Sequence, residues 1–492
     1  MSSARGMSLP ELLDGLIPAV PDVRVFDLQL DSRRIAPGQL FVALPGQHHD
    51  GRDFIREAVA GGAAAVIAEP PLPAGLDTGS VPVVSIEGLA RRLGGLAARF
   101  FGDPAKALAV LGVTGTNGKT TCTRLVAQLL RRCGQRCGVI GTLGATLGDD
   151  IAAALNTTPD AIALQRQLAD WCEAGVDSVA MEVSSHALDQ GRVDGLAFRV
   201  ALFTNLSRDH LDYHGSMAAY GQSKMKLFLS PQLGDAVINL DDAFSATLLA
   251  NLPAAVRPWT YSATGRAEAD IRVLRADFHS GGVRADVLTP WGEGSFDSPL
   301  PGDFNLANVT AAIAAAVCLG APLASVLAAV SALQPVPGRM ELVANTRQLQ
   351  VVIDYAHTPD ALAQVLAALR PHVEGELHVV FGCGGDRDPG KRPLMGEVAC
   401  RLADQVLLTS DNPRGEDPEA ILDAIEAGCE RPVVREPDRA RAIHRALAGA
   451  RPGDCVVIAG KGHEDYQILG DRRVPFSDRA CARDALSGGQ TA

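Results

Sequence analysis

Short apolar runs alternate with segments of helical periodicity along almost the whole chain. Among the first hundred residues, strands are predicted at 25–30, 38–43, 64–68 and 81–85, and a helix at 53–60. The alternation continues in the middle of the chain at 108–113, 136–141, 161–174, 178–183, 200–205 and 236–240. It returns in the last third at 350–354, 362–369, 377–382, 405–409, 420–427 and 454–458. Strands that alternate with helices predict an α/β protein whose sheets are largely parallel, with helices on both faces.

Two turn-rich segments interrupt this pattern. Gly102-Asp103-Pro104 precedes the run at 108–113, and Pro335-Val336-Pro337-Gly338 precedes the last third. Glycine and proline at this density are typical of domain boundaries, and a chain of 492 residues is long enough for several domains of about 100–200 residues each. We therefore expect domains at residues 1–103, 104–336 and 337–492.

One stretch is apolar enough to suggest a membrane span. Residues 304–338 contain no charged side chain, and residues 309–333 are long enough to cross a bilayer. The stretch is rich in alanine, however, and Gly320-Ala321-Pro322 divides it into two helical pieces. Two buried helices are the better prediction, and the N-terminus has no apolar run typical of a signal peptide. We expect no membrane insertion.

Composition narrows the classes of protein that fit. The formal net charge of −12 argues against a nucleic-acid-binding protein, because phosphate backbones need a concentrated basic face, although local phosphate sites remain open. The ten cysteines are scattered, and the nearest pair, Cys133 and Cys137, lacks the spacing of a zinc site. Reduced thiols of this kind are typical of a cytoplasmic protein.

The strongest chemical signal is the segment that follows the run at 108–113. A turn made of Gly115, Thr116, Asn117 and Gly118 leads into a helix that starts at Lys119. Glycines let backbone N–H groups approach a phosphate, Lys119 would reach the β- and γ-phosphates, and the Thr120 hydroxyl would hold Mg²⁺. The usual spacing of such loops requires glycine where this chain has Val113, so the match is to a variant. A tight turn without a ligand is the simpler alternative.

Polar side chains follow several of the other predicted strands. Glu182 comes at the end of one strand and His210 shortly after the next, and together they are suited to hold Mg²⁺ beside a phosphate loop. Each also has a structural alternative, as a helix cap or as an ordinary loop histidine. Lys224 and Lys226 lie on a short predicted helix, and from the residues alone both are predicted at the surface.

In the last third, four polar clusters stand at strand ends: residues 354–357, 384–388, 410–414 and 460–464. Arginine binds a carboxylate through two parallel hydrogen bonds, and a carboxylate binds an ammonium. The clusters therefore suggest a site for a zwitterionic molecule. Solvated turns at the edge of a sheet would explain each cluster singly, but they explain all four together less well.

Eight motifs, which follow one another along the chain, together indicate one protein family. They are GTNGKTT, MEVSSH, TNLSRDHLDYHG, GDFNLANV, DYAHTPD, GGDRD, DNPRGEDP and GKGHEDYQ. Together they closely resemble the Mur ligases of bacterial cell-wall synthesis, over residues 30 to about 479. The resemblance implies a small N-terminal α/β domain for a UDP-linked substrate, a central P-loop ATPase and a C-terminal Rossmann-like domain for an incoming amino acid.

The resemblance also implies roles for individual residues. The UDP-substrate would contact Leu30, Ser32, Gln47, His48, His49, Asn156, Thr157, Thr158, Ser184, Gln190 and Arg192. ATP would contact Gly115, Thr116, Asn117, Gly118, Lys119, Thr120, Thr121, Asn305, Arg339 and Asp354. Mg²⁺ would be held by Thr120, Glu182, His210 and Lys224, the last as the carbamate found in family members. The amino acid would contact Arg387, Asp411, Asn412, Pro413, Arg414, Gly460 and Glu464.

The implied reaction is an ATP-dependent amide-bond synthesis in peptidoglycan precursor formation, on which cell shape and division depend. The pattern around Arg414 resembles that of members adding meso-2,6-diaminopimelate to UDP-N-acetylmuramoyl-L-alanyl-D-glutamate. Catalysis would rest on Lys119, Glu182, His210 and Lys224, which offset negative charge while an acyl phosphate forms. The implied cofactors are ATP and Mg²⁺, and we expect a cytoplasmic monomer that binds small molecules.

Alternatives stay open at this point. A related ligase could add L-lysine or another amino acid, and relatives that add D-alanyl-D-alanine or extend folate share the phosphate loop. A nucleotide-regulated binding protein without turnover is a different class of explanation. Because Glu182, His210 and Lys224 are all present, and a binder needs no such second metal site, the ligase is the better prediction.

Overall fold

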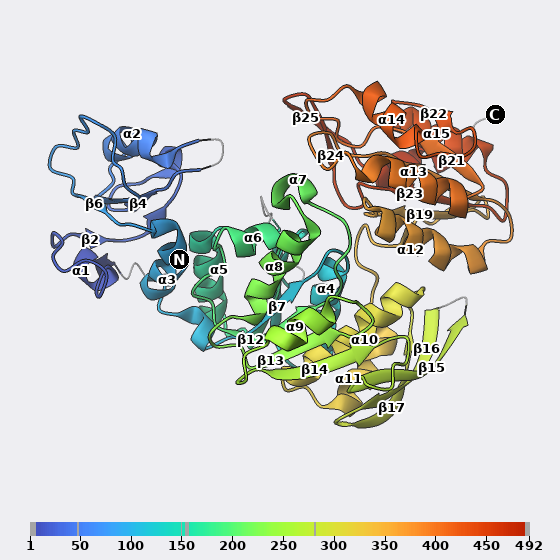
Figure 1. Cartoon of the computed structure of the whole chain (residues 1–492), viewed down its shortest axis with the longest axis horizontal. Helices are drawn as coiled ribbons and strands as arrows, with labels where there is room; N and C mark the ends of the chain where they lie inside the picture. The colour runs from blue at the N-terminus through green and yellow to red at the C-terminus, as the bar shows by residue number, and fades with distance from the viewer. Residues whose placement is uncertain (1–5, 47–48, 149, 153–156, 280–281, 488–492) are drawn as a thin grey trace. The chain divides into compact units, whose positions relative to one another are not determined.

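The computed structural model describes residues 6–46, 49–148, 150–152, 157–279 and 282–487 (Figure 1). By its internal contacts the chain divides into two units, which are described separately. The first comprises Met1–Gly112, Gln135–Val200 and Leu229–Gly234, and the second comprises Val113–Gly134, Ala201–Phe228 and Asp235–Ala492. Parallel strands alternate with helices in both units, so the prediction of an α/β protein is confirmed.

The N-terminal part of the first unit is built on a small parallel sheet with the order β3-β4-β5-β6. Its strands are β3 (Leu28–Gln29), β4 (Leu40–Ala43), β5 (Ala65–Ala68) and β6 (Val83–Ser85), and its α-helices are α1 (Leu9–Leu12), α2 (Ile55–Ala60) and α3 (Leu89–Phe100). Side chains alternate along a strand, so Leu40 and Val42 of β4 enter one hydrophobic cluster while Phe41 and Ala43 enter another. Both faces of β4 are therefore buried.

The prediction of one strand at 25–30 was wrong. Two separate strands occupy this stretch: β2 (Arg24–Val25), which pairs with β1 (Met7–Ser8), and β3, which belongs to the parallel sheet. The chain changes sheets at Phe26, whose ring is about half exposed. The apolar run is therefore not buried continuously.

The remainder of the first unit continues the α/β pattern. Its elements are β8 (Cys137–Gly141), β9 (Gly144–Leu147), β10 (Asp150–Ala152), α5 (Ala161–Glu173), β11 (Ser178–Glu182) and α6 (Ser185–Asp189). Strand β11 pairs in parallel with β8, whereas β9 and β10 are antiparallel additions. Asp160 begins α5 by accepting hydrogen bonds from two backbone N–H groups of its first turn.

Two strands, β7 (Ala109–Thr114) and β12 (Phe198–Phe203), contribute residues to both units. Within the described residues, the largest sheet has the strand order β10-β9-β8-β11-β7-β12-β13-β14-β15-β16-β17. The chain leaves β12 at Phe203, so Thr204 and Asn205, predicted as part of the strand, lie in the following loop. This loop borders the phosphate-binding segment described below.

The second unit contains the phosphate-loop helix α4 (Lys119–Arg132), and the chain returns to this unit near the end of β12, where two helices come before the next strand. These and the next elements are α7 (Leu211–His214), α8 (Met217–Phe228), β13 (Asp235–Asn239), α9 (Ser245–Asn251), β14 (Arg257–Ser262), β15 (Ile271–His279), β16 (Gly282–Thr289) and β17 (Gly292–Ser298). The antiparallel meander β15-β16-β17 was not predicted from the sequence. Its strands bury one face only and carry charged residues on the other, so the apolar signal is weak.

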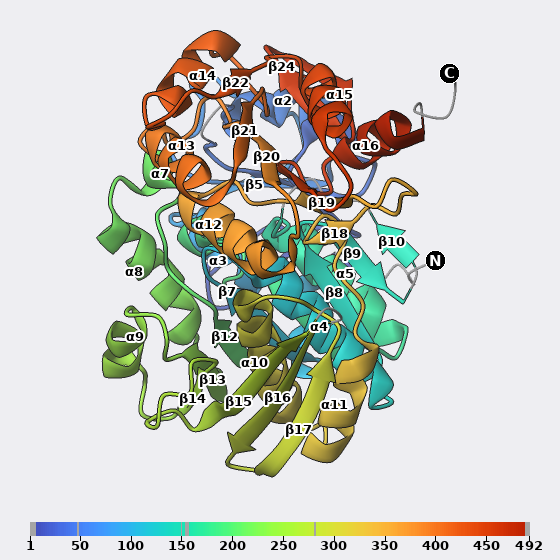
Figure 2. The same cartoon turned by 90° about the vertical axis from the view of Figure 1, so that its right-hand side faces the viewer.

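The apolar stretch at 304–338 forms two helices, α10 (Asp303–Cys318) and α11 (Leu323–Ala329), as predicted. Figure 2 shows both helices beside the strands β13 to β17, and α10 also contacts α4. Most of α10 is buried against these elements because its alanines allow close approach. Among the described residues, no helix is both long and apolar enough to span a membrane.

The last third forms a six-stranded sheet with the order β18-β19-β23-β20-β21-β22. Its strands are β18 (Glu341–Leu342), β19 (Gln350–Asp354), β20 (Leu377–Phe381), β21 (Gln405–Leu408), β22 (Val434–Arg435) and β23 (Cys455–Ala459). All pairs are parallel except that of β18 with β19. Strand β23 is the last of the six strands along the chain, but in the sheet it lies between β19 and β20. Loops that are distant in sequence therefore meet at its carboxyl end.

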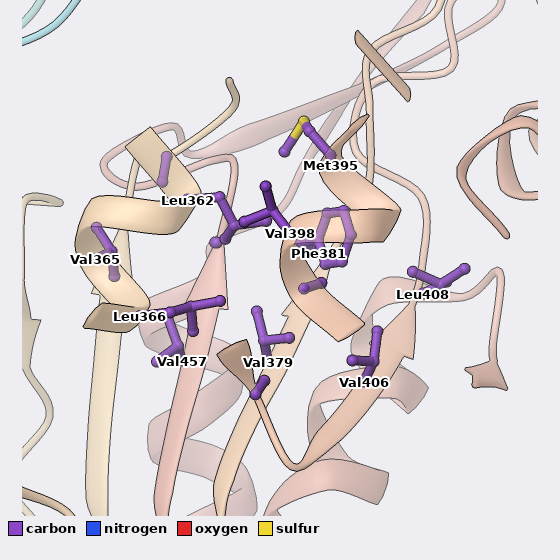
Figure 3. Packing of buried hydrophobic residues seen from close by; sticks show 14 of the residues in the cluster. Leu362, Val365, Leu366, Val379, Phe381, Met395, Val398, Val406, Leu408 and Val457 are labelled. Atoms are coloured by element: carbon purple, nitrogen blue, oxygen red, sulfur yellow. The ribbon is translucent and has the colours of Figure 1, made fainter. Parts of the chain in front are cut away.

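Helices cover both faces of this sheet. They are α12 (Pro359–Leu369), α13 (Lys391–Leu402), α14 (Pro418–Glu426), α15 (Arg439–Gly449) and α16 (Asp478–Ser487), and a hairpin of β24 (Tyr466–Leu469) and β25 (Arg472–Pro475) precedes α16. Figure 3 shows Val379 and Phe381 of β20 packing with Leu362 and Leu366 of α12. Val380, between them, joins the opposite cluster with α15. The prediction of a largely parallel sheet with helices on both faces is confirmed for this part.

Candidate active site

The loop between β7 and α4 requires glycine at two positions. Gly115 and Gly118 have φ angles of 152° and 84°, which are unfavourable for other residues. A Cβ atom on Gly115 would lie 1.9 Å from Thr204 Oγ1, and one on Gly118 would lie 2.6 Å from Asn308 Oδ1. The backbone at these two turns is thus packed closely against the side chains of Thr204 and Asn308, which leaves no room for a Cβ atom.

Hydrogen bonds from the segment after β12 hold this loop in place. The backbone N–H groups of Thr116 and Asn117 donate to Asn205 O and Asn205 Oδ1, both at 2.9 Å. The ammonium of Lys119 donates to Gly115 O and Thr116 O, both at 2.8 Å. Lys119 therefore lies against the loop. To bind a phosphate, its ammonium would give up these two hydrogen bonds to carbonyls and donate to phosphate oxygens instead.

The prediction that Lys224 lies at the surface was wrong, whereas Lys226 is exposed. Lys224 is 1% exposed, and its ammonium donates to Gly115 O at 2.8 Å and lies 4.2 Å from the centre of the Tyr220 ring. Burial and the neighbouring positive charge of Lys119 hold the pKa of Lys224 well below its usual value. The helix α8 points Lys224 toward the phosphate loop. The spacing of Lys224 and Lys226 in the sequence could not reveal which of the two is buried.

His210 begins α7 with a left-handed backbone conformation, φ 53°. Its ring lies 6.1 Å from that of Tyr220, so His210 and Lys224 both flank this tyrosine. The adjacent Asp209, which sequence reasoning did not single out, is buried 3.4 Å from His210 Nε2, 3.6 Å from His357 Nε2 and 3.4 Å from Lys391 Nζ. Asp209 therefore joins His210 to the last third of the chain.

The charges around Asp209 favour its ionised form. Burial alone would raise the pKa of this carboxyl, but the hydrogen bond with His357 and the charge of Lys391 hold the pKa well below its usual range. Beside it, Arg208 forms a two-pronged ion pair with Asp388 at 3.0 and 3.1 Å. Asn117 of the phosphate loop likewise donates to Asp360 Oδ2 at 3.1 Å. Several polar contacts thus link the phosphate-loop region to the C-terminal sheet within the second unit.

Arg339, directly after the proline-rich hinge, also reaches the phosphate loop. Its Nη2 donates to Thr120 Oγ1 at 3.3 Å, and its guanidinium lies 4.2 Å from the centre of the Tyr355 ring. Asp354, at the end of β19, accepts from the backbone N–H groups of Met340 and Ala356, both at 2.7 Å. Burial raises the pKa of Asp354, although Arg339 opposes this effect. Asp354 therefore shapes the hinge next to Thr120.

Two further predicted ATP contacts lie in the same unit. Thr121 is buried in the first turn of α4. Asn305 is buried in the first turn of α10, where its Nδ2 donates to Pro301 O at 2.8 Å. Because α10 packs against α4, the phosphate loop and Asn305 belong to one packed region.

Glu182 ends β11 in the first unit and is 1% exposed. Its Oε1 accepts from the backbone N–H of Thr142 at 2.8 Å, and its Oε2 accepts from the Thr142 hydroxyl at 3.1 Å. The Thr142 hydroxyl in turn lies 3.1 Å from that of Thr157. Thr142, which follows β8, was missed by the sequence analysis although it too stands at a strand end.

The predicted UDP-substrate residues form two groups in the first unit. Near β3, Leu30 N donates to Gln29 Oε1, Ser32 Oγ donates to Glu57 Oε2 at 3.2 Å, and His49 is exposed. Around β11, the Thr158 hydroxyl donates to Glu182 O at 2.8 Å, Ser184 caps α6, and Arg192 donates to Thr158 O and to the side chain of Gln190. Gln47, His48 and Asn156 lie outside the described residues.

In the last third, the four polar clusters do meet at the carboxyl ends of the parallel strands. Asn412 Nδ2 donates to Glu464 Oε2 at 3.0 Å, and the Tyr355 hydroxyl donates to Glu464 Oε1 at 3.4 Å. Lys461, which sequence reasoning left unassigned, is 0% exposed and donates to Glu464 Oε2 at 2.8 Å. These residues come from the loops after β19, β21 and β23.

Arg414 stands beside this cluster in a left-handed conformation, φ 53°. Its Nη1 donates to Gly385 O at 2.8 Å and to Asn412 O at 3.4 Å, while β24 pairs with its backbone. Partial burial and the nearby charge of Arg387 lower the pKa of Arg414, whereas Asp411 and Glu464 oppose the shift. A cation, two carboxylates and an amide are thus gathered in one place.

The remaining predicted residues complete this arrangement. Arg387 is exposed and donates to Asp386 O at 2.8 Å, while Asp411, Asn412 and Pro413 are buried. Gly460 has φ 111°, and its N–H donates to Asp354 O at 3.1 Å. In the described part of the chain, no three side chains of His, Cys, Asp or Glu are grouped to hold a metal.

Comparison with known proteins agrees with this geometry. Family models match residues 27–101 (Mur ligase family, catalytic domain), 113–316 (Mur ligase middle domain) and 338–462 (Mur ligase, glutamate ligase domain). A protein of Alkalilimnicola ehrlichii is 48% identical over 94% of this chain and 95% of its own length. The chain belongs to the Mur ligase family. It is accordingly an ATP-dependent ligase that forms amide bonds, as the motifs predicted.

Two curated relatives and one solved structure with the same name illustrate this similarity. The Alkalilimnicola ehrlichii protein is a UDP-N-acetylmuramoyl-L-alanyl-D-glutamate--2,6-diaminopimelate ligase, and so is one of Ectopseudomonas mendocina, 49% identical over 98% of this chain and 100% of its own. A solved structure of a protein with that name matches with a TM-score of 0.71 and 39% identity. It covers 99% of this chain and 100% of the other.

Proposed function

We propose that this Mur ligase joins meso-2,6-diaminopimelate to the D-glutamate side-chain carboxylate of UDP-N-acetylmuramoyl-L-alanyl-D-glutamate, in peptidoglycan precursor synthesis. The observation that carries the proposal is the half-buried guanidinium of Arg414 beside Asn412 and Glu464. A second carboxylate distinguishes diaminopimelate from lysine, and a fixed arginine is the side chain best suited to bind it. The relatives with this printed name support the same substrate.

The cluster supplies complementary groups for both ends of the amino acid. Glu464 and Asp411 carry negative charge suited to an ammonium, and Arg414 with Arg387 carries positive charge suited to a carboxylate. Asn412 offers an amide whose orientation is fixed by its bond to Glu464. Binding at this site would leave one amine of the substrate to act as the nucleophile.

The phosphate loop would bind ATP at the N-terminus of α4. Gly115 and Gly118 allow the tight turns of the loop backbone because they carry no Cβ atom, and Lys119 would move from its two carbonyl partners to the phosphates. Asn305, on the helix that packs against α4, would contact the base, and Arg339 with Asp354 would close the site from the hinge. These roles are proposals that the packing of the second unit supports.

Of the unmodified side chains proposed for Mg²⁺, two offer the oxygen donors that this ion prefers and one offers a nitrogen. Thr120 offers a hydroxyl, Glu182 a carboxylate and His210 a ring nitrogen, and Mg²⁺ when bound would offset negative charge on the triphosphate. Lys224 would join them as a carbamate. As an ammonium it repels Lys119 across the loop, whereas a carbamate there would attract it.

The surroundings of Lys224 suit that modification. Its burial and low pKa favour the neutral amine, which can attack CO₂ to form an N–C bond and release one proton. The product carries a negative charge where the unmodified side chain is a neutral amine or an ammonium. The resulting carboxylate oxygens would face the phosphate loop, because Lys224 Nζ already contacts Gly115 O.

The chemistry follows from the weak reactivity of a carboxylate. A carboxylate oxygen attacks the γ-phosphorus of ATP, the bond to ADP breaks, and an acyl phosphate results. The neutral amine of diaminopimelate then attacks the carbonyl carbon, phosphate leaves, and the nitrogen loses a proton. Lys119 would stabilise the charge on the transferred group, and the polar contacts of Arg208 and Asn117 with the C-terminal sheet would bring the amine to it.

The organisation of the enzyme follows from its substrates. We propose three domains at residues 1–103, 104–336 and 337–492, for the UDP-substrate, ATP and the amino acid respectively; the three family models support these bounds. Because ATP and UDP-linked precursors are cytoplasmic metabolites, the enzyme would act in the cytoplasm. We expect it to work as a monomer, since each proposed substrate has its residues within one chain.

Phosphate release from ATP tests the proposal directly. The purified protein is mixed with Mg²⁺, ATP and UDP-N-acetylmuramoyl-L-alanyl-D-glutamate, and then with meso-diaminopimelate, L-lysine or D-alanyl-D-alanine in separate reactions. We expect release with diaminopimelate, about 100-fold or more above that with L-lysine at equal concentration. Mass spectrometry of the product should show one added diaminopimelate residue.

The other outcomes are equally informative. Preference for L-lysine would refute the role given to Arg414 while leaving the ligase intact. Tight ATP binding without release in any mixture would refute ligase turnover and favour a nucleotide-regulated binding protein. Omission of the UDP-substrate is the control, since release that does not depend on it would be simple ATP hydrolysis.

A further inference from the structure

A fully buried lysine lies at the centre of the amino-acid cluster. Lys461 follows β23 between two glycines with positive φ, Gly460 and Gly462, and its side chain is 0% exposed. Its ammonium has three N–H donors and three oxygen neighbours: Glu464 Oε2 at 2.8 Å, Asn412 Oδ1 at 3.1 Å and Asp411 Oδ1 at 3.5 Å. Burying an ammonium is costly unless its charge is paired, and here it is.

These bonds determine how Asn412 is oriented. Asn412 Oδ1 accepts from Lys461 and from the backbone N–H of Ile468 at 3.0 Å, so its Nδ2 must face the other way. That Nδ2 donates to Glu464 Oε2, the same oxygen that Lys461 binds. Lys461 therefore fixes Asn412 and Glu464 together, and removal of its charge would release both.

Lys461 also sets the charge of the cluster. At the end of the cluster suited to an ammonium, Asp411 and Glu464 contribute two negative charges and Lys461 one positive charge, while Arg414 and Arg387 add positive charge for a carboxylate. Removal of the Lys461 charge would make the whole cluster more negative by one unit. A more negative site favours L-lysine, which carries a net charge of +1 in solution, over diaminopimelate, whose two carboxylates and two ammonium groups cancel.

We propose that Lys461 is a positioning and specificity-determining residue of the amino-acid site, acting through Asn412 and Glu464. The proposal rests on the proposed diaminopimelate ligase function. Lys461 makes no contact with the phosphate loop: its bonded partners Asp411, Asn412 and Glu464 all belong to the amino-acid cluster. Its effect should therefore be confined to the amino-acid substrate.

The test is steady-state kinetics of the full chain with Lys461→Met, which is one atom shorter, keeps the unbranched apolar part of the side chain and removes the charge. A hydrogen bond to a charged group is worth enough to predict a rise of about 10- to 100-fold in KM for diaminopimelate. The KM for ATP should stay within about threefold of wild type, because the ATP contacts are separate. The ratio of kcat/KM for diaminopimelate to that for L-lysine should fall by about 10-fold or more.

Two further variants separate positioning from a general loss of structure. Arg431→Met removes a cation of the same sheet that donates to the backbone carbonyls of Cys400 and Asp404, away from the cluster, and should leave the KM for diaminopimelate unchanged. If Lys461 acts through Glu464, adding Lys461→Met to Glu464→Gln should raise that KM by less than about threefold. If the double variant instead raises the KM for diaminopimelate by the product of the two single effects, the proposal is contradicted.

Wild-type turnover with diaminopimelate is measured first, and its absence would overturn the proposed function and this inference with it. Turnover in the wild type combined with an unchanged KM and an unchanged selectivity ratio in Lys461→Met would overturn the inference alone. Circular dichroism and ATP binding show whether the variant is folded. If Lys461→Met is unfolded, Lys461→Gln takes its place, with the same expected directions and the same refuting result.

Discussion

Substitution of Arg414 is the sharpest test of how this ligase selects its amino acid. The backbone of Arg414 has φ 53°, which is unfavourable for alanine, so a change to alanine would mix backbone strain with loss of the guanidinium. Asparagine adopts this conformation more easily than most residues. Arg414→Asn is therefore the cleaner perturbation, and Arg414→Lys is the matched variant that keeps the charge.

The expected magnitude follows from the contacts of the guanidinium. Backbone carbonyls of Gly385 and Asn412 hold Nη1, and among the described residues no protein acceptor binds Nη2, which leaves that edge for a substrate carboxylate. Loss of one partner of a buried charge pair costs about 2–5 kcal/mol, and because Arg414 is only half-buried the lower end applies. About 2–3 kcal/mol corresponds to a fall of about 30- to 150-fold in kcat/KM for diaminopimelate.

The assay compares kcat/KM for meso-diaminopimelate and L-lysine in the phosphate-release reaction. For L-lysine, which has an ammonium at its far end but lacks the second carboxylate of diaminopimelate, Arg414→Asn should leave kcat/KM unchanged or raise it by a few fold. Arg414→Lys should fall between the wild type and Arg414→Asn, because a lysine keeps the charge but loses the fork of donors. An unchanged ratio between the two substrates in Arg414→Asn would refute the reasoning.

Three other predictions concern the phosphate loop, the core and the hinge. Gly115→Ala should reduce kcat/KM for ATP by about 100-fold or more, because its Cβ would lie 1.9 Å from Thr204 Oγ1; near wild-type kinetics would show that the loop can rearrange. Leu366→Ala should lower the free energy of unfolding by about 2–5 kcal/mol in urea denaturation, since Leu366 is fully buried (Figure 3), whereas exposed Leu342→Ala should change it little. His463 gives a pH dependence: burial, with the charge of Arg339, lowers its pKa from 6.5 to about 4. Between these values the unfolded chain binds the proton more readily, so stability should fall as pH drops from 6.5 to 4, and His463→Gln should show a shallower fall.

Local patterns predicted most elements of the fold. The strand at 350–354 has the predicted bounds, and β7, β11 and β20 differ from prediction by a residue or so, because buried parallel strands are short runs of apolar residues between turns. The meander β15-β16-β17 was missed because its half-exposed strands mix charged and apolar residues. The stretch at 25–30 was misread because a continuous apolar run does not show that the chain changes sheets.

The candidate site was predicted unevenly, for reasons of the same kind. Gly115, Lys119 and Thr120 belong to one short motif whose spacing carries its chemistry. Lys224 was expected at the surface, and Lys461 was placed in a polar cluster but given no role of its own. Neither burial could be predicted, because a lysine is buried only when distant residues supply its partners.

The sequence alone determined which segments become strands and helices and which polar side chains stand at strand ends, since both depend on neighbours along the chain. Only the tertiary structure decided which strand ends meet. Nothing in the run at 454–458 specifies that β23 pairs with β19 on one side and β20 on the other. That non-local pairing brings Lys461 and Glu464 to Tyr355 and Asn412, and so creates the amino-acid cluster.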